Sequence, residues 1–200
     1  MISVWELQNK ERKAIIITDI ENITVALNKS QSQSLLFAIR NFLTLRLKKE
    51  NIADKEFIAF FGEHPRKKKA YLKKTLKILG FKIRSIKLKP PYYAEQIDHA
   101  LLSYLHRLAR KYHKIPTDIV LIASDNDYAN GLAEIQRKWR FNNIARVIVI
   151  SRANSSKLKK WSSEFWKVTI KRTNQLISIN QKDFKAISVN GYTVVFERLK

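Results

Sequence analysis

The chain has 200 residues, of which 45% are hydrophobic, and it carries a formal net charge of +22. This length favours a single domain, because it fills one hydrophobic core well and is short for two. The excess of Lys and Arg favours a polyanion, above all nucleic acid, as the partner, since each neutralised phosphate releases a condensed counterion. The absence of cysteine excludes disulfides, thiolate chemistry and Cys-ligated zinc. A bound metal ion would therefore be held mainly by oxygen, which favours Mg²⁺ or Mn²⁺.

The sequence also bears on membrane association. No apolar run approaches the roughly 18 to 20 residues that a membrane-spanning helix needs. The first residues lack the layout of a secretory signal peptide. We therefore expect a soluble, cytoplasmic protein with no membrane partner.

Strand-like and helix-like patterns alternate along the first 150 residues. Short runs rich in β-branched residues predict buried strands, and a run that alternates apolar with basic residues predicts an edge strand. The predicted strands are residues 14–18, 57–61, 81–88 (the edge strand), 118–123 and 147–150. Apolar residues at helical spacing predict the intervening helices. The predicted helices are residues 34–49, 66–79 with Gly80 as the C-terminal cap, 94–112, and a helix through Leu132, Ile135 and Trp139.

This alternation predicts an α/β fold, with a three-layer, doubly wound, mostly parallel sheet and right-handed crossovers. A short helix at 155–161 and a strand at 165–170 follow. Asn190 and Gly191 lie between two strand-like runs, which predicts a C-terminal β-hairpin. We assign residues 1–172 to the main domain and 173–200 to a hairpin packed on or beside it. The hairpin is a candidate surface for a homodimer or a protein partner.

Four acidic residues stand out in this basic chain, namely Asp19, Asp98, Asp125 and Asp127. Asp19 directly follows a predicted buried strand, Asp125 and Asp127 lie in the turn after another, and Asp98 lies near the start of a predicted helix. Ligands of doubly wound sheets bind beyond the C-terminal ends of the strands, where the strand order reverses. If the strand before Asp19 neighbours the strand before Asp125, the four carboxylates converge at one edge of the sheet.

Convergence of these acids would require a cation. Two carboxylates about 5 Å apart repel by roughly 3 kcal/mol at an effective dielectric constant near 20. A divalent ion relieves this repulsion and activates water for attack on a phosphodiester. Each acid also has a structural explanation: Asp19 and Asp125 as caps or turn residues, and Asp98 as a first-turn acid facing the helix dipole.

Three segments resemble the successive signatures of NYN domains, a branch of the PIN-like nucleases. They are residues 16–23 (IITDIENI), 96–101 (QIDHAL) and 120–128 (VLIASDNDY). Their order and spacing match over about residues 14–170. The chain departs from the family at Ala123, where a small hydroxyl residue is usual, and at Ser124 and Asn126, where glycines are frequent.

The resemblance implies a Rossmann-like PIN fold that binds Mg²⁺ or Mn²⁺ and cleaves RNA. Carried over by position, Asp19, Asp98, Asp125 and Asp127 would be the metal-binding, catalytic acids. Asn22 would be a supporting residue that orients the site or contacts the substrate. The C-terminal hairpin lies outside the resemblance.

Basic and aromatic residues supply candidate contacts to nucleic acid. Residues 66–89 contain eleven Lys or Arg and no acid, and residues 137–172 contain eleven against one Glu. Unpaired bases stack on aromatic side chains, for which the candidates are Tyr92, Tyr93, Tyr128, Trp139, Trp161 and Trp166. The residues selected as nucleic-acid contacts are Arg66, Lys67, Lys68, Lys69, Tyr92, Tyr93, Ser124, Asn126 and Arg152.

The function predicted from the sequence is a metal-dependent endoribonuclease that hydrolyses single-stranded RNA with metal-activated water; DNA is a further substrate candidate. One alternative is a nucleic-acid-binding protein without catalysis, in which the acids are structural. A second is phosphatase or phosphotransfer chemistry of the haloacid dehalogenase type. That alternative is weakened because the residues after Asp19 lack the second Asp of such enzymes, and +22 is excessive for a small substrate.

Overall fold

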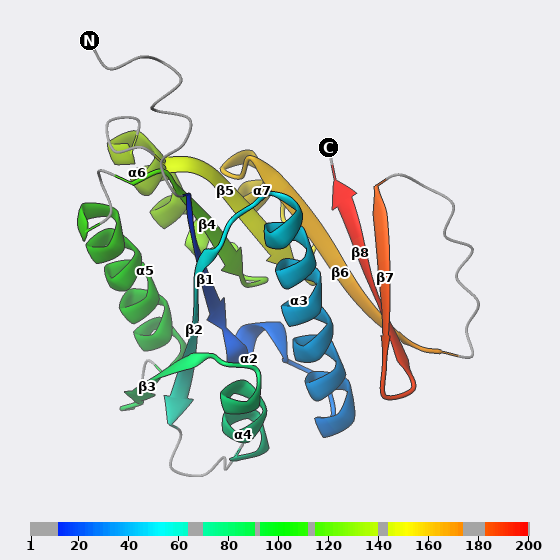
Figure 1. Ribbon diagram of the computed structural model, residues 1–200. Coiled ribbons are helices and arrows are strands. Elements are labelled where there is room, and N and C mark those ends of the chain that lie inside the picture. Colours follow the sequence, from blue (N-terminus) through cyan, green and yellow to red (C-terminus); the bar gives the residue numbers. More distant parts are fainter. Residues whose placement is uncertain are drawn as a thin grey trace.

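The computed structural model describes residues 12–63, 70–90, 93–111, 115–139, 144–173 and 183–199 (Figure 1). These residues form one eight-stranded sheet with the strand order β3-β2-β1-β4-β5-β6-β8-β7. The sheet is parallel from β3 to β6 and antiparallel from β6 to β7. The strands are β1 (Lys13–Asp19), β2 (Asp54–Glu63), β3 (Lys82–Lys87), β4 (Thr117–Ile122), β5 (Ile144–Ser151), β6 (Glu164–Arg172), β7 (Phe184–Val189) and β8 (Tyr192–Leu199).

Helices cover both faces of the sheet, which gives the three layers expected from the sequence (Figure 1). The helices are α2 (Ile20–Ile23), α3 (Lys29–Lys49), α4 (Ala70–Ile78), α5 (Tyr93–Lys111), α6 (Tyr128–Trp139) and α7 (Ser156–Lys160). One hydrophobic core lies between the sheet and α2, α3 and α4, and a second lies between the sheet and α5, α6 and α7. The mostly parallel α/β architecture is therefore confirmed. None of the helices in the described residues has the length and apolar character required to span a membrane.

The central strands β1 and β4 are buried along almost their whole length. Their apolar residues alternate between the two cores, because successive side chains of a strand point to opposite faces. Ile15 and Ile17 belong to the core under α5 and α6, and Ile16 belongs to the core under α3. This alternation directs the next odd-numbered residue, Asp19, toward α5 and α6.

Two local predictions need correction. The helix predicted to begin at residue 34 begins at Lys29, because Asn28 and Gln31 form a capping box in which each side chain accepts from the other's backbone N–H. The apolar periodicity hid this start, since the first turns carry buried serines such as Ser32. The four-residue helix α2 was not predicted, and it exists because Asp19 caps it.

The C-terminal hairpin continues the main sheet, because β8 pairs antiparallel with β6. Asn190 and Gly191 both have positive φ angles, 49° and 75°, as a two-residue turn that matches the strand twist requires. Phe196 of β8 is fully buried, and its ring stacks on that of Phe42 in α3 with centroids 4.3 Å apart. The hairpin thus contributes to the core under α3.

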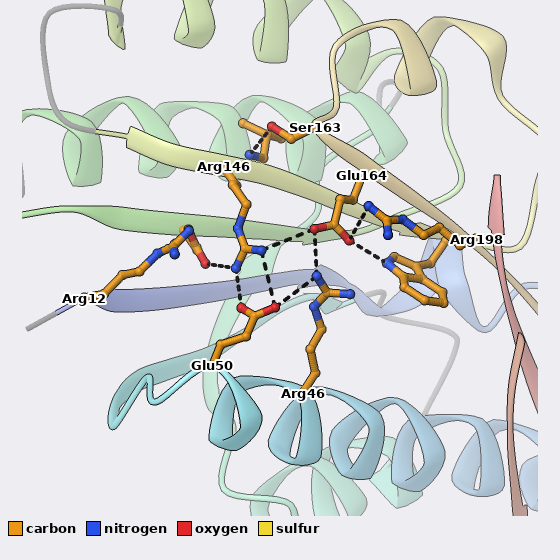
Figure 2. A network of polar contacts seen from close by, with 10 residues as sticks. Arg12, Arg46, Glu50, Arg146, Ser163, Glu164 and Arg198 are labelled. Carbon is orange, nitrogen blue, oxygen red and sulfur yellow. Dashed lines mark hydrogen bonds and ion pairs between the residues drawn. The ribbon is translucent and has the colours of Figure 1, made fainter. Parts of the chain in front are cut away.

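Charged residues form a network at the edge of the sheet where the parallel strands begin (Figure 2). Asp118 of β4 is fully buried and accepts hydrogen bonds from Arg12 at 2.6 Å and from Arg146 of β5 at 2.7 Å. Arg146 also pairs with Glu50 at the C-terminal end of α3, and with Glu164 of β6 at 3.3 Å. These contacts connect α3 to β4, β5 and β6.

Removal of the Asp118 charge tests the importance of this network. Asp118→Asn places an amide between two guanidinium groups that remain charged and partly buried. We expect the free energy of unfolding to fall by about 3 kcal/mol, the scale measured when one partner of a buried pair is lost. Chemical denaturation measures the change. The matched control is Asp54→Asn, whose carboxylate pairs with Lys13 but is 56% exposed; there a loss below about 1 kcal/mol is expected.

Candidate active site

The strand order places β1 directly beside β4, so the arrangement on which the sequence-based site depends is present. Strand order reverses between these two strands, and both end at the same edge of the sheet. Asp19 is the last residue of β1, and Asp125 lies in the loop after β4. This edge is the usual location of ligands in doubly wound sheets.

Asp19 is buried, with only 4% of its surface exposed. One carboxylate oxygen accepts the backbone N–H of Asn22 at 3.1 Å, which caps α2. The other oxygen accepts the hydroxyl of Tyr128, the first residue of α6, at 2.7 Å. Asp19 is therefore a helix cap, as its structural explanation predicted. Capping accounts for only one of its two carboxylate oxygens.

Tyr128 joins Asp19 to Asp98. Its fully buried hydroxyl also forms a short hydrogen bond with a carboxylate oxygen of Asp98 in α5. A hydroxyl group has one proton, so it can donate to only one carboxylate at a time. Without a cation, the second carboxyl group must carry a proton of its own to donate to the hydroxyl oxygen. If it is ionised, its oxygen lies against the hydroxyl oxygen with no proton between them.

The pKa values agree with this conflict. Burial raises the pKa of Asp19 to about 6, and its hydrogen bonds from Tyr128 and Asn22 compensate only in part. Burial likewise raises the pKa of Asp98, and the charges of Asp125 and Asp127 raise it further. Shifted carboxyl groups of this kind concentrate at functional sites, although structural networks produce them as well.

Asp125 and Asp127 occupy the loop between β4 and α6. Asp125 is half-buried and Asp127 is exposed. A carboxylate oxygen of Asp125 accepts the backbone N–H of Asp127 at 3.1 Å, which fixes the turn. Both side chains act on Asp98 electrostatically, so the structure brings all four predicted acids into one region.

Hydrogen bonds close a ring around this region. The side-chain oxygen of Asn22 in α2 accepts the backbone N–H of Ser124, and the hydroxyl of Ser124 accepts the backbone N–H of Arg152 at 2.9 Å. The guanidinium of Arg152 donates back to the carbonyl oxygens of Ile23, at 3.2 Å, and Val25. Asn22 thus holds α2 against the loop after β4, which fits the supporting role predicted for it.

The predicted nucleic-acid contacts have varied positions. Ser124 and Arg152 belong to the ring, and the side-chain oxygen of Asn126 accepts a hydrogen bond from Ser155, the cap of α7. The structure does not describe the side chain of Tyr93, at the start of α5. The other predicted contacts lie outside the described residues, namely Arg66, Lys67, Lys68, Lys69 and Tyr92.

Two aromatic residues considered for base stacking are wrong for that role. Tyr128 is 0% exposed and Trp166 is 6% exposed, so neither ring presents a face to solvent. The burial of Tyr128 beside the acids could have been predicted from the sequence, because Tyr128 begins a helix directly after the acidic turn. Glu21 was also missed as a site residue: it lies close enough to Asp19 to raise its pKa further.

The fit of a divalent cation is partial. Asp19 and Asp98 both contact the Tyr128 hydroxyl, carboxylate oxygens are ligands that Mg²⁺ prefers, and neighbouring acids add negative charge. Among the described residues, however, no three His, Asp or Glu side chains are placed to hold one ion. Mg²⁺ retains several waters and is commonly bound through one or two carboxylates. Asp19 and Asp98 are therefore the residues that would hold it, with Asp125 nearby.

Comparison with known proteins finds a structure of similar fold and gives no information on function. No family model matches the chain, and no curated protein matches it significantly. Among solved structures, the fold is similar to a protein of unknown function from Vibrio parahaemolyticus, with a TM-score of 0.52 and 16% sequence identity. The match covers 82% of this chain and 94% of the other. The α/β architecture, including most of its length, is thus shared with a natural protein.

Replacement of Asp19 by Asn tests the raised pKa. A carboxyl group whose pKa is 3.8 in the unfolded chain and about 6 in the folded protein binds its proton more tightly when folded. The stability that the protonated Asp19 carboxyl group contributes to the folded protein is fully present below pH 4 and is lost as the pH rises through about 6. With a chelator present, we expect Asp19→Asn to be roughly 2 kcal/mol more stable than the parent at pH 7 and about equal to it at pH 4.

Chemical denaturation at both pH values measures this difference. Asp54→Asn serves as the control, since its carboxylate is 56% exposed in its pair with Lys13 and its effect should stay below about 1 kcal/mol at both pH values. An Asp19→Asn protein that is less stable than its parent at pH 7 would show that the carboxylate is not strained.

Proposed function

We propose that this chain is a metal-dependent endoribonuclease that hydrolyses single-stranded RNA, with a PIN-like fold. The observation that supports the proposal most strongly is the convergence of Asp19 and Asp98 on the Tyr128 hydroxyl at the switch point of the sheet. The net charge of +22 supports a polyanionic substrate. The resemblance of the three acidic segments to NYN domains supports the choice of RNA.

The roles of the residues follow from their contacts. A bound Mg²⁺ or Mn²⁺ supplies Lewis acidity and a water of lowered pKa. Asp19 and Asp98 hold the ion, and Tyr128 keeps the two carboxylates in register through its hydroxyl. Burial and the two carboxylates raise the pKa of that hydroxyl far above its usual range, so it retains its proton throughout.

The other site residues position the substrate-facing loop. Asp125 and Asp127 line the open side of the site, where they can receive the proton of an attacking water or orient the ion. Asn22, Ser124 and Arg152 fix the distance between α2 and this loop. Preorganisation of this kind lowers the barrier because the groups need not rearrange as charge develops.

One observation favours a second candidate, a nucleic-acid-binding protein without catalysis. The described residues contain no ready-made group of three metal ligands, and Asp19 serves as a helix cap. In this alternative the acids are structural and the basic surface alone is functional. Metal binding and cleavage separate the two candidates.

Titration with Mn²⁺ tests whether the carboxylates hold an ion. Binding to the folded state alone raises its stability by about 2.7 kcal/mol at a metal concentration a hundred times the dissociation constant. We expect a saturable rise of about 5 °C in the melting temperature of the parent, and less than about 1 °C for Asp98→Asn. A rise of equal size in both proteins would show that the ion binds elsewhere.

Cleavage of labelled single-stranded RNA in Mn²⁺ tests the catalytic role directly. Asp19→Asn and Asp125→Asn should each lower the rate by at least about a hundredfold, because each removes an anionic group from the metal environment. RNA binding in chelator should change by less than about threefold, since the phosphate contacts remain. Asp54→Asn should cleave like the parent. Equal cleavage by Asp125→Asn and the parent would leave the binding-only function as the correct one.

A further inference from the structure

A groove lies between the last turns of α3 and the C-terminal hairpin. The helix and the hairpin pack against each other (Figure 1). Its volume is about 510 Å³, within the range of small-ligand pockets. Four residues of α3 line it at positions i, i+3, i+4 and i+7, the spacing that places side chains on one helix face. The lining residues are Phe42, Leu45, Arg46, Lys49, Glu50, Trp166, Lys185, Ala186, Ile187 and Arg198.

The floor of the groove is apolar and rigid. The Phe42 ring stacks on Phe196 with an interplanar angle of 6°, and it contacts the Trp166 ring edge-on with centroids 5.0 Å apart. Leu45 borders this floor with 66% of its surface exposed, and Ile187 of β7 is half-buried opposite. An exposed leucine beside a fixed apolar floor leaves a surface that a planar apolar group can cover.

The rim of the groove is cationic. Lys49 and Lys185 are exposed, and Arg198 is 45% exposed in its side chain. Glu50, the only acid among the described lining residues, already pairs with Arg46 and with Arg146 (Figure 2). The Nε of Arg46 is buried, and the described residues offer it no acceptor. The groove therefore combines an apolar floor with an excess of positive charge.

We propose that this groove binds one nucleotide of a single-stranded nucleic acid, with the base on the apolar floor and the phosphates at Lys49, Lys185 and Arg198. The exposed Leu45 and the half-buried Ile187, above the buried aromatic floor, supply apolar contact for an unpaired base, and the rim matches its backbone. The charge of the whole chain favours a nucleic acid over an acidic peptide. The statement that the bound strand is also the substrate rests on the proposed ribonuclease function.

The groove and the acidic site lie at opposite ends of α3. Five residues separate α2, which Asp19 caps, from the start of this helix. The first groove residue, Phe42, lies 13 positions after Lys29, so about 20 Å of helix separates the start of α3 from the groove. A strand held in the groove is therefore bound away from the bond that is cut. Such a second contact raises affinity through effective concentration and leaves the chemical step unchanged.

Fluorescence anisotropy with labelled single-stranded RNA, in the presence of chelator, tests the groove without catalysis. Leu45→Glu and Lys185→Glu should each raise the dissociation constant about tenfold, and Leu45→Ala about threefold. The matched controls are Ile115→Glu and Arg107→Glu, because Ile115 is 39% exposed, Arg107 of α5 is exposed, and both lie outside the two basic stretches of the sequence. Each control should change binding by less than about twofold.

A duplex of the same length separates base contact from general electrostatics. Its paired bases cannot reach the floor, so Leu45→Ala should leave duplex binding unchanged within about 1.5-fold. In cleavage assays with Mn²⁺, the groove variants should raise KM and leave kcat unchanged. Unfolding curves that match the parent confirm that these exposed substitutions leave the fold intact.

The two proposals fail in different ways. Groove variants that bind single-stranded RNA as tightly as the Ile115→Glu and Arg107→Glu controls overturn the groove assignment, whether or not the parent cleaves RNA. Equal loss of duplex and single-strand binding in Leu45→Ala also overturns it. A parent that cleaves no RNA but loses single-strand binding in the groove variants overturns the ribonuclease and supports the groove as a nucleic-acid site.

Discussion

Two carboxylates that share one hydroxyl proton are the constraint on which the candidate site depends. Asp19 and Asp98 approach each other through Tyr128, in a location where burial penalises their charge. A folded chain maintains such an arrangement only if other interactions compensate for its cost. The site therefore favours binding of a positive charge by the Asp19 and Asp98 carboxylates. This charge is a proton when no metal ion is bound and would be a divalent cation in the proposed enzyme.

The opposite edge of the sheet has the complementary arrangement. There, Asp118, Glu50 and Glu164 face four arginines, so each of these carboxylates has a cationic partner (Figure 2). The strands thus begin at an edge where charges are paired and end at an edge where Asp19 and Asp98 form no ion pair with the described residues. This asymmetry allows a strained site in a stable domain, because the two edges are separated by the full length of the strands.

The hairpin connects this organisation to substrate binding. Pairing of β8 with β6 carries the sheet past α3, and the stacking of Phe196 on Phe42 fixes the hairpin against that helix. The same contacts create the apolar groove with its cationic rim. In the proposed function, the polyanion would contact two separate surfaces of this +22 chain: the acidic site with its surrounding loops, and the groove at the far end of α3.

The sequence by itself determined the strands, the layer order and the four acids, because buried parallel strands are continuous apolar runs and their ends are marked by a change to polar residues. It also contained the Asn190–Gly191 turn, since positive φ angles restrict residue choice. Only the tertiary structure decided that Tyr128 lies between Asp19 and Asp98, that Arg152 binds backbone carbonyls, and that the hairpin makes a groove with α3. These features arise from contacts between residues thirty or more positions apart or from side-chain direction, neither of which local periodicity encodes.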